Sequence, residues 1–335
     1  MSDADIQQTH SDVIPAADAT PATGRTGVQL LSVSVHSDGQ RLDNFLLSRL
    51  RGLPKSHLYR LIRKGEIRIN KKRCKPDTRV GEGDVIRVAP LRLSAETPMA
   101  IPGERLLALL AGSVLYEDED LLIINKPPGL AVHAGTGSNV GVIEALRFAA
   151  APGEFRELVH RLDKETSGCL MIAKSGLALK TLQEDLKQKR IRKTYSALVH
   201  GHWPAELTEV DVPLRKFQPH EGERIVRVDK NGKPSLTRFR LLKTFPDASL
   251  VEAQPLTGRT HQIRVHCQHA GHPIIGDDKY TSHKRHRFEQ VRQLNLHASQ
   301  LSLQHPATGK ALTITAPLQE GRFALEQPKN TVKSS

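Results

Sequence analysis

The chain has 335 residues, more than one ordinary hydrophobic core needs and enough for two domains with tails. No apolar run approaches the roughly 18 residues that a membrane-spanning helix requires, so we expect no membrane association. The three cysteines form no CxxC pair, which argues against a disulfide framework and favours a reducing compartment. The net charge of +13 and the pI near 9.8 indicate a polyanionic partner.

Residues 1–28 predict a disordered tail. The segment is rich in Ala, Thr, Asp and Pro and contains no aromatic residue, so it cannot bury a core. It holds four Asp against one Arg and lacks a hydrophobic signal segment, so it indicates neither a transit peptide nor a secretory signal. Cytoplasmic localisation is the default expectation.

Residues 29–90 predict a small α/β domain with a basic surface. Residues 29–39 predict a strand that ends in an Asp-Gly turn at 38–39. Two amphipathic helices (41–50 and 54–64) and two strands (66–70 and 84–88) follow. Residues 41–90 contain 14 Lys or Arg against 5 Asp or Glu. The basic residues expected to contact RNA lie on the second helix and the adjoining turn: Lys55, Arg60, Arg63, Lys64, Lys71, Lys72 and Arg73. Such clustering favours RNA phosphate contacts over the alternative, a solvated face on a structural module.

The sequence pattern of this first domain resembles the S4 RNA-binding domain. The resemblance rests on RLDNFL, LPKSHLYRLIRKGEIRINKKRCKP and VGEGDVIRV within residues 41–88. Residues 91–112 contain Pro98 and Pro102 and are expected to be a linker with room for a short helix at 104–110. The second domain is expected over 113–325, followed by a flexible tail at 326–335.

The second domain is organised around residues 158–168, LVHRLDKETSG. Apolar runs on both sides predict short buried strands, so Asp163 lies on a polar loop held by a rigid frame. An isolated Asp in such a loop more often caps a turn than performs chemistry. Two other features favour chemistry: Tyr195 near the start of an alternating strand, and the Arg-rich segment 257–266, which we interpret as a strand or as an extended or helical run after a turn at Gly258.

Other elements of the second domain follow from hydrophobic periodicity. Hairpins are expected at 114–124 and 237–253, and a helix at 176–190. The basic segments 213–235 and 281–293 are expected on the surface, where Lys284, Arg285 and Arg287 would contact RNA.

A cluster of histidines follows Gly258. His266, His269 and His272 are spaced three apart, which does not place them on one helix face, and no carboxylate is interleaved as in HExxH. We therefore expect packing or phosphate contact and predict no metal site.

Four motifs together are similar to those of the RluA-type pseudouridine synthases: KPPGLAVH (126–133), HRLDKETSG (160–168), KTY (193–195) and LTGRTHQIRVHCQHAGHPIIGD (256–277). GERIVRV at 222–228 and GVIEALR at 141–147 are most similar to the C branch of the bacterial large-subunit enzymes. The resemblance covers about residues 30–325. It implies an α+β pseudouridine synthase fold, with a mixed, largely antiparallel central sheet flanked by helices, behind a small N-terminal α/β S4 domain.

The chemistry that the resemblance implies is the isomerisation of uridines to pseudouridine in 23S ribosomal RNA, at sites of the 955/2504/2580 class. Moving the base from N1 to C5 breaks a glycosidic bond, so positive charge develops at the sugar. One carboxylate can attack or stabilise C1′ without a metal or cofactor, and the resemblance gives this role to Asp163. Arg264 would favour its ionised form, and Tyr195 would stack on the uracil.

The resemblance also implies contacts with the flipped nucleotide. Arg161 would be a wedge or phosphate contact that stabilises the flipped nucleotide, with a surface phosphate contact without a flipping role as the alternative, and Ile263 would form an apolar wall. Apart from the resemblance, the guanidinium of Arg259 suits a phosphate, and His261 is expected to pack or to contact phosphate. Lys126 and His133 in the first motif are interpreted as structural.

The expected partner is 23S rRNA or a large-subunit assembly intermediate, bound by a monomer that needs no cofactor. Two alternatives stay open: a tRNA or dual-specificity pseudouridine synthase, and a non-catalytic S4-type assembly factor, which the basic window alone would explain. A nucleobase deaminase needs zinc ligands such as CxxC, which the sequence lacks.

Overall fold

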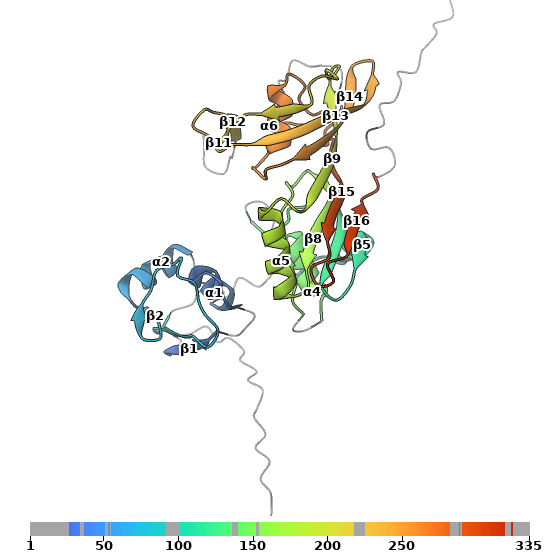
Figure 1. The fold of residues 1–335 in the computed structure, drawn as a ribbon. Coiled ribbons are helices and arrows are strands. Elements are labelled where there is room, and N and C mark those ends of the chain that lie inside the picture. Colours follow the sequence, from blue (N-terminus) through green and yellow to red (C-terminus); the bar gives the residue numbers. More distant parts are fainter. Residues whose placement is uncertain are drawn as a thin grey trace, which may run out of the picture. The chain divides into compact units, whose positions relative to one another are not determined.

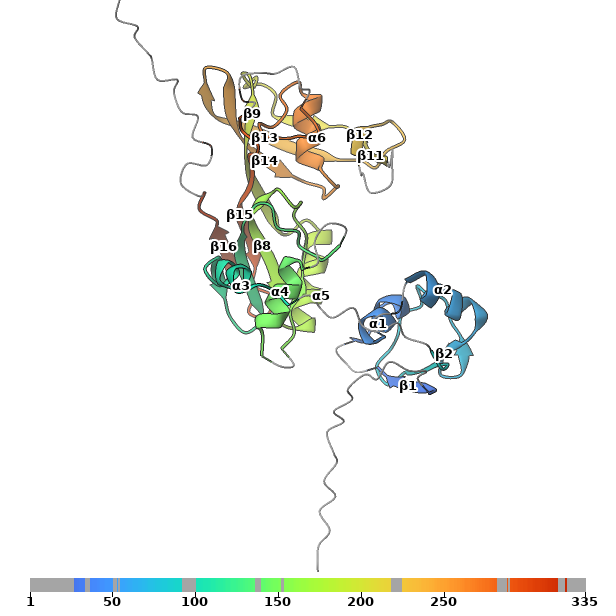
Figure 2. The ribbon, with the colours of Figure 1, turned by 180° about the vertical axis from the view of Figure 1, so that it is seen from behind.

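The computed structural model describes residues 27–33, 37–50, 53, 55–91, 101–135, 140–151, 154–217, 225–281, 288, 290–318 and 323. The chain divides into two compact units, residues 1–97 and 98–335, and each has its own core (Figures 1 and 2). Within the described residues, no helix combines the length and apolar character needed to cross a membrane. The predicted tails, 1–28 and 326–335, lie almost wholly outside the described residues.

The first unit is a four-stranded antiparallel sheet with two helices, in the strand order β1-β4-β2-β3. Its elements are β1 (Gln29–Ser32), α1 (Leu42–Arg49), α2 (Lys55–Lys64), β2 (Ile67–Ile69), β3 (Lys72–Arg73) and β4 (Val85–Val88). The expected helices and the later strands are confirmed within one or two residues. The first strand is shorter than expected, ending at Ser32, and the pair β2–β3 adds a hairpin inside the predicted basic turn.

The apolar faces predicted for the two helices form the core of this unit. Leu42, Phe45 and Leu46 of α1 are fully buried, and Leu58 of α2 packs in the same cluster. Gly65 follows α2 with φ +77°, a left-handed conformation that glycine adopts without steric cost.

The second unit is a ten-stranded mixed sheet with helices on both faces. The strand order is β10-β13-β14-β9-β15-β8-β6-β5, with β16 beside β15 and β7 beside β8. Every pair is antiparallel except β8–β15, so the expected α+β fold with a largely antiparallel sheet is confirmed. The strands are β5 (Val114–Glu117), β6 (Leu121–Lys126), β7 (Glu157–Leu158), β8 (Ser167–Ala173), β9 (Arg192–His200), β10 (Glu209–Asp211), β13 (Leu236–Phe245), β14 (Ala248–Pro255), β15 (Leu296–Gln304) and β16 (Ala311–Thr315). A separate hairpin joins β11 (Leu214–Phe217) to β12 (Ile225–Val228).

Alternate side chains of β8 serve two different cores. Leu170 and Ile172 pack with α3 (Glu104–Ala111) and α4 (Val142–Ala149), whereas Cys169 and Met171 pack with α5 (Gly176–Lys187). Figures 1 and 2 show α5 on one face and α3 with α4 on the other. Because both faces are covered, this strand is a continuous apolar run.

Two segments differ from the sequence expectations. The short helix expected at 104–110 is present as α3 (Glu104–Ala111), but Leu110 is buried in the core beside α4, so this helix belongs to the second unit and not to a linker. The strand interpretation of 257–266 is wrong in its second half, because α6 (Gln262–His269) begins directly after the turn. The extended or helical alternative describes it correctly.

Gly168 closes the central loop against the sheet. It has φ +104°, and a Cβ at this position would lie 2.3 Å from the carbonyl oxygen of Ala298 on β15. These two residues are partners in the parallel β8–β15 pair. Only glycine therefore allows the two strands to approach where the loop that carries Asp163 enters the sheet.

Candidate active site

The loop that carries Asp163 is anchored at both ends. The backbone N–H of Thr166 donates to the carbonyl of Asp163 at 3.1 Å, which forms a tight turn. The ammonium of Lys126 is fully buried and donates to the carbonyl oxygens of Pro127, Leu130 and Lys164, at 2.8 to 3.0 Å. All three of its donors are used inside the protein, so Lys126 ties the KPPG segment to the residue after Asp163.

The carboxylate of Asp163 lies beside the buried guanidinium of Arg264. Nη1 of Arg264 is 3.6 Å from Oδ2 of Asp163; the side chains are 8% and 24% exposed, respectively. The other side of the guanidinium makes two hydrogen bonds to Asp277, at 2.6 and 2.8 Å, and the Asp277 side chain is fully buried. Burial lowers the pKa of Arg264, but the hydrogen bonds and charge of Asp277, with that of Asp163, raise it more, so the group stays charged.

His261 approaches the same carboxylate from the start of α6. Its Nε2 is 3.9 Å from Oδ2 of Asp163, and its Nδ1 is 2.6 Å from the hydroxyl of Tyr280. Burial lowers the pKa of His261 to about 4, although the charge of Asp163 opposes this shift. The imidazole is therefore neutral at physiological pH.

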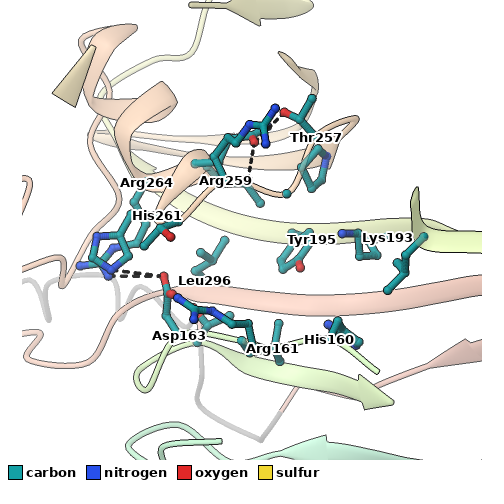
Figure 3. A pocket seen from close by; sticks show the side chains of 18 of the residues that line it. His160, Arg161, Asp163, Lys193, Tyr195, Thr257, Arg259, His261, Arg264 and Leu296 are labelled. Carbon is teal, nitrogen blue, oxygen red and sulfur yellow. Dashed lines mark hydrogen bonds and ion pairs between the residues drawn. The ribbon is translucent and has the colours of Figure 1, made fainter. Parts of the chain in front are cut away.

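Tyr195 points from β9 into a cavity of about 570 Å³ that Asp163, Ile263 and Arg264 also line (Figure 3). The ring is almost wholly buried, and burial followed by the charge of Asp163 raises the pKa of its phenol. Leu296, the first residue of β15, adds an apolar wall. A cavity of this size accommodates a small-molecule-sized group such as one nucleotide.

Cationic side chains surround the rest of the cavity. Arg161 and Arg259 line it and are exposed, and Arg259 donates from Nε to the carbonyl of Pro234. Lys187 and Lys216 are exposed at the same cavity. Of the charged groups that line it, Asp163 is the one carboxylate among the described residues, so the cavity suits an anionic ligand.

Lys193 was not singled out by itself from the sequence, although it belongs to the KTY motif. It lies two residues before Tyr195 on β9, so the two side chains are on the same face of the strand. Lys193 is half-buried and lines the far part of the cavity (Figure 3). Burial lowers the pKa of its ammonium. The nearby His160 has its pKa lowered to about 3, by burial and then by the charge of Lys193, and its Nε2 accepts a hydrogen bond from the backbone N–H of Met171.

The structure thus gathers Asp163, Tyr195, Arg264, Ile263 and His261 at one cavity, with Arg161 and Arg259 beside them. Sequence reasoning missed Asp277 and Tyr280, which lie in the quoted GHPIIGD segment or just after it. What marks Asp277 as part of the site is that its buried carboxylate lies next to Arg264. This contact is visible in the folded structure but not in a linear motif.

The basic residues predicted in the first unit are exposed. Arg60, Arg63 and Lys64 lie on α2, and Lys71, Lys72 and Arg73 follow at the β2–β3 hairpin. The side chain of Lys55 lies outside the described part of the chain, as do Lys284, Arg285 and Arg287.

The histidines after Gly258 face separate partners. Nε2 of His266 contacts the hydroxyl of Ser235 at 2.8 Å, and Nδ1 of His272 contacts the carbonyl of His200 at 2.9 Å. Within the described residues, no three His, Cys, Asp or Glu side chains converge in a metal-binding arrangement.

Comparisons with known proteins agree with this geometry. Residues 120–269 match the RNA pseudouridylate synthase family, and residues 40–86 match the S4 domain. The chain is 47% identical over 303 residues to ribosomal large subunit pseudouridine synthase C of Yersinia pestis, covering 88% of this chain and 94% of that protein. It is 47% identical over 305 residues to the protein of the same name from Escherichia coli K12, covering 89% and 96%.

A solved structure, human RNA pseudouridylate synthase domain containing 4, superposes with a TM-score of 0.53 at 31% identity, covering 64% of this chain and 92% of that one. The motifs, the mixed sheet and the full-length similarity agree. The chain belongs to the RNA pseudouridylate synthase family and carries an S4 domain ahead of its synthase domain.

Proposed function

We propose that this protein isomerises uridines of 23S ribosomal RNA to pseudouridine and that Asp163 is its nucleophile. One observation carries the proposal: the Asp163 carboxylate faces a cavity of nucleotide size beside a buried, permanently charged Arg264. The names of the relatives from Yersinia pestis and Escherichia coli support a large-subunit ribosomal RNA as the substrate.

The proposed reaction starts with attack by the Asp163 carboxylate on C1′ of the target uridine. The N1–C1′ bond breaks as a bond from the carboxylate to C1′ forms, and the uracil turns within the cavity. C5 then bonds to C1′, the carboxylate leaves, and the proton on C5 departs while N1 gains one. The product is an isomer, so the proposed reaction consumes no co-reactant and needs no cofactor.

Tyr195 and Arg161 are proposed to hold the flipped base. Stacking of one base on an aromatic ring contributes about 1–3 kcal/mol, and the flat face of uracil suits such a contact. Arg161 lines the cavity from the Asp163 loop and would stabilise the extruded nucleotide, whose unstacking costs a few kcal/mol. Ile263, Arg259 and His261 would complete the walls.

The S4 unit is proposed to add RNA affinity rather than chemistry. Neutralising Arg60, Arg63 and Lys64 together should weaken RNA binding and flatten its dependence on salt, by about 0.7–0.9 in slope for each lost phosphate contact. The rate of a single turnover with saturating RNA should change little. An unchanged salt slope would place the RNA elsewhere.

The decisive experiment maps pseudouridines in a strain that lacks this gene and carries plasmid-borne variants. Asp163→Asn should abolish the modification, whereas Glu165→Gln, which removes an exposed carboxylate from the same loop, should restore it. Full restoration by Asp163→Asn would exclude Asp163 as the nucleophile. If Asp163→Asn restored ribosome assembly without modification, the protein would act as an assembly factor.

The same mapping identifies the RNA. Loss of pseudouridine from 23S rRNA alone supports the proposal, and the 955/2504/2580 class of sites is our prediction. Loss from tRNA, with or without rRNA, would show a tRNA or dual-specificity enzyme. Cytoplasmic residence and a monomeric state also stay predictions, and sedimentation of the purified chain tests the second.

A further inference from the structure

His261 has an unusual backbone for its residue type. It precedes α6 with φ 53° and ψ 20°, in the left-handed region that costs a non-glycine residue about 1–2 kcal/mol. Its side chain does not cap the helix. Instead it lines the cavity (Figure 3). Its Nδ1 also contacts the hydroxyl of Tyr280, so the surrounding contacts hold the strained backbone.

The hydrogen bonds of Tyr280 determine which nitrogen of His261 carries the proton. The buried phenol oxygen accepts from the backbone N–H of Val226 at 3.0 Å and lies 2.6 Å from Nδ1 of His261. The phenol has one hydrogen, and among the described residues Nδ1 is the acceptor within hydrogen-bond distance of it. If Nδ1 were protonated, the buried hydroxyl would keep an unused donor, which costs about 1–3 kcal/mol. The hydrogen therefore points to Nδ1, and a neutral His261 carries its proton on Nε2.

Nε2 is the nitrogen that faces the nucleophile. It lies 3.9 Å from Oδ2 of Asp163, which is too long for a direct hydrogen bond and short enough to become one after a small movement. The same phenol ring packs under Arg264, whose guanidinium carbon is 5.1 Å from the ring centre, and edge-on to His261. Tyr280 thus supports both groups that approach Asp163.

We propose that Tyr280 fixes His261 as its Nε2–H tautomer and that this N–H orients the Asp163 carboxylate for attack on the sugar. His261 and Tyr280 are positioning residues in this scheme, and Tyr280 acts through His261. The inference rests on the proposed role of Asp163. A neutral donor orients the carboxylate without adding a second positive charge to that of Arg264, which would stabilise the anion further and weaken it as a nucleophile.

The tautomer can be tested without RNA. Nitrogen-15 NMR of the full chain, with His261 assigned by comparison with His261→Gln, should show Nε2 protonated and Nδ1 unprotonated near pH 7.5. Tyr280→Phe keeps the ring under Arg264 and removes the hydroxyl, so the signal should shift towards a mixture of tautomers. A native signal with Nδ1 protonated, or one that Tyr280→Phe leaves unchanged, would overturn the proposal.

Two substitutions at position 261 test the kinetic consequence. The amide N–H₂ of Gln can reach the place of Nε2, whereas that of Asn reaches only the place of Nδ1. Asn tolerates the left-handed backbone better than Gln, so a purely structural role predicts that His261→Asn is the better replacement. We expect the opposite for the single-turnover rate, with His261→Asn slower than His261→Gln by about tenfold or more.

Equal rates for these two variants, or a faster His261→Asn, would refute the orienting role. The single-turnover rates of both His261 variants are compared with those of native protein and of Asp163→Glu on the same RNA. If native protein modified no uridine, the proposed function would fail, while the NMR result would still decide the tautomer.

Discussion

Replacing Asp277 by Asn should disable the site from a position that does not reach the nucleophile. Asp277 is fully buried and accepts two hydrogen bonds from Arg264, as well as backbone N–H bonds from Lys279 and Tyr280 at 3.1 and 3.2 Å. The substitution is nearly isosteric, but it removes the negative charge. Loss of one partner from a buried ion pair typically costs 3–5 kcal/mol, because the other charge stays buried.

We therefore expect Asp277→Asn to lower the free energy of unfolding of the synthase unit by about 3–5 kcal/mol. Trp203 is the single tryptophan of the chain and lies buried in this unit, so its fluorescence during urea unfolding reports this unit. The single-turnover rate should fall by about 10² or more, since Arg264 is no longer fixed beside Asp163. Asp278→Asn, which removes the exposed neighbouring carboxylate, is the matched control and should change stability by less than about 0.5 kcal/mol.

A double variant separates the charge effect from a packing defect. Adding Arg264→Gln to Asp277→Asn removes the buried charge that has lost its partner. The free energy of unfolding of the double variant should therefore be about 1–3 kcal/mol higher than the sum of the two single effects predicts. The reasoning would be refuted if Asp277→Asn were as mild as Asp278→Asn, or if the two substitutions were simply additive.

Three further predictions follow from individual contacts. Tyr195→Leu should lower kcat/KM by about ten- to a hundredfold, because the stacking contact with the base is lost. Tyr195→Phe should keep the shape of the pH–rate profile between pH 6 and 9, because burial raises the pKa of the native phenol and keeps it protonated in this range. Hydrogen bonding from Arg41 lowers the pKa of Asp43 from 3.8 to about 2. The contribution of this pair to the stability of α1 is therefore present above pH 3.8 and is lost as the pH falls towards 2. Because Arg41 is exposed, we expect a small effect: protection of the α1 amides from hydrogen exchange should be lower at pH 3 than at pH 6, and this difference should be absent in Asp43→Asn. Gly168→Ala should lower the free energy of unfolding in urea by about 2–4 kcal/mol, because the new Cβ would meet the backbone of β15. Gly271 has φ +83° with nothing within 4 Å of a Cβ, so Gly271→Ala should lower it by only about 1 kcal/mol. Equal losses for the two variants would contradict the steric explanation.

The sequence predicts the elements that have one clear period. The faces of α1 and α2 are read correctly because Leu42, Phe45 and Leu46 recur at helical spacing in α1, and the basic residues of α2, Arg60, Arg63 and Lys64, lie on its exposed side. β8 is recognised as a buried strand because five apolar residues follow one another. What periodicity cannot show is that alternate residues of this strand belong to two cores, since that depends on helices from distant parts of the chain.

The segment after Gly258 shows why the site is harder to predict than the fold. As a strand, 261 and 264 would lie on opposite faces, because their separation is odd. In the structure, His261 takes a left-handed conformation just before α6 and Arg264 lies in the first turn of that helix, and both side chains reach Asp163. Residues 262–269 include several polar side chains, so the apolar residues do not recur at the regular spacing that predicts a helix. The motif names the residues, but the geometry depends on which period the backbone adopts.

The arrangement around Arg264 gives a physical reason why the proposed nucleophile, Asp163, would need a second acid nearby. An arginine that formed a two-fold hydrogen-bonded pair with Asp163 would occupy both carboxylate oxygens and leave none directed at the sugar. Here the fork binds Asp277 at 2.6 and 2.8 Å, and a single nitrogen approaches Asp163 at 3.6 Å. Arg264 therefore supplies positive charge without closing a pair. Asp277 is separated from Asp163 by more than a hundred residues. The arrangement in which one acid binds Arg264 and the other keeps its oxygens open therefore exists only in the folded chain.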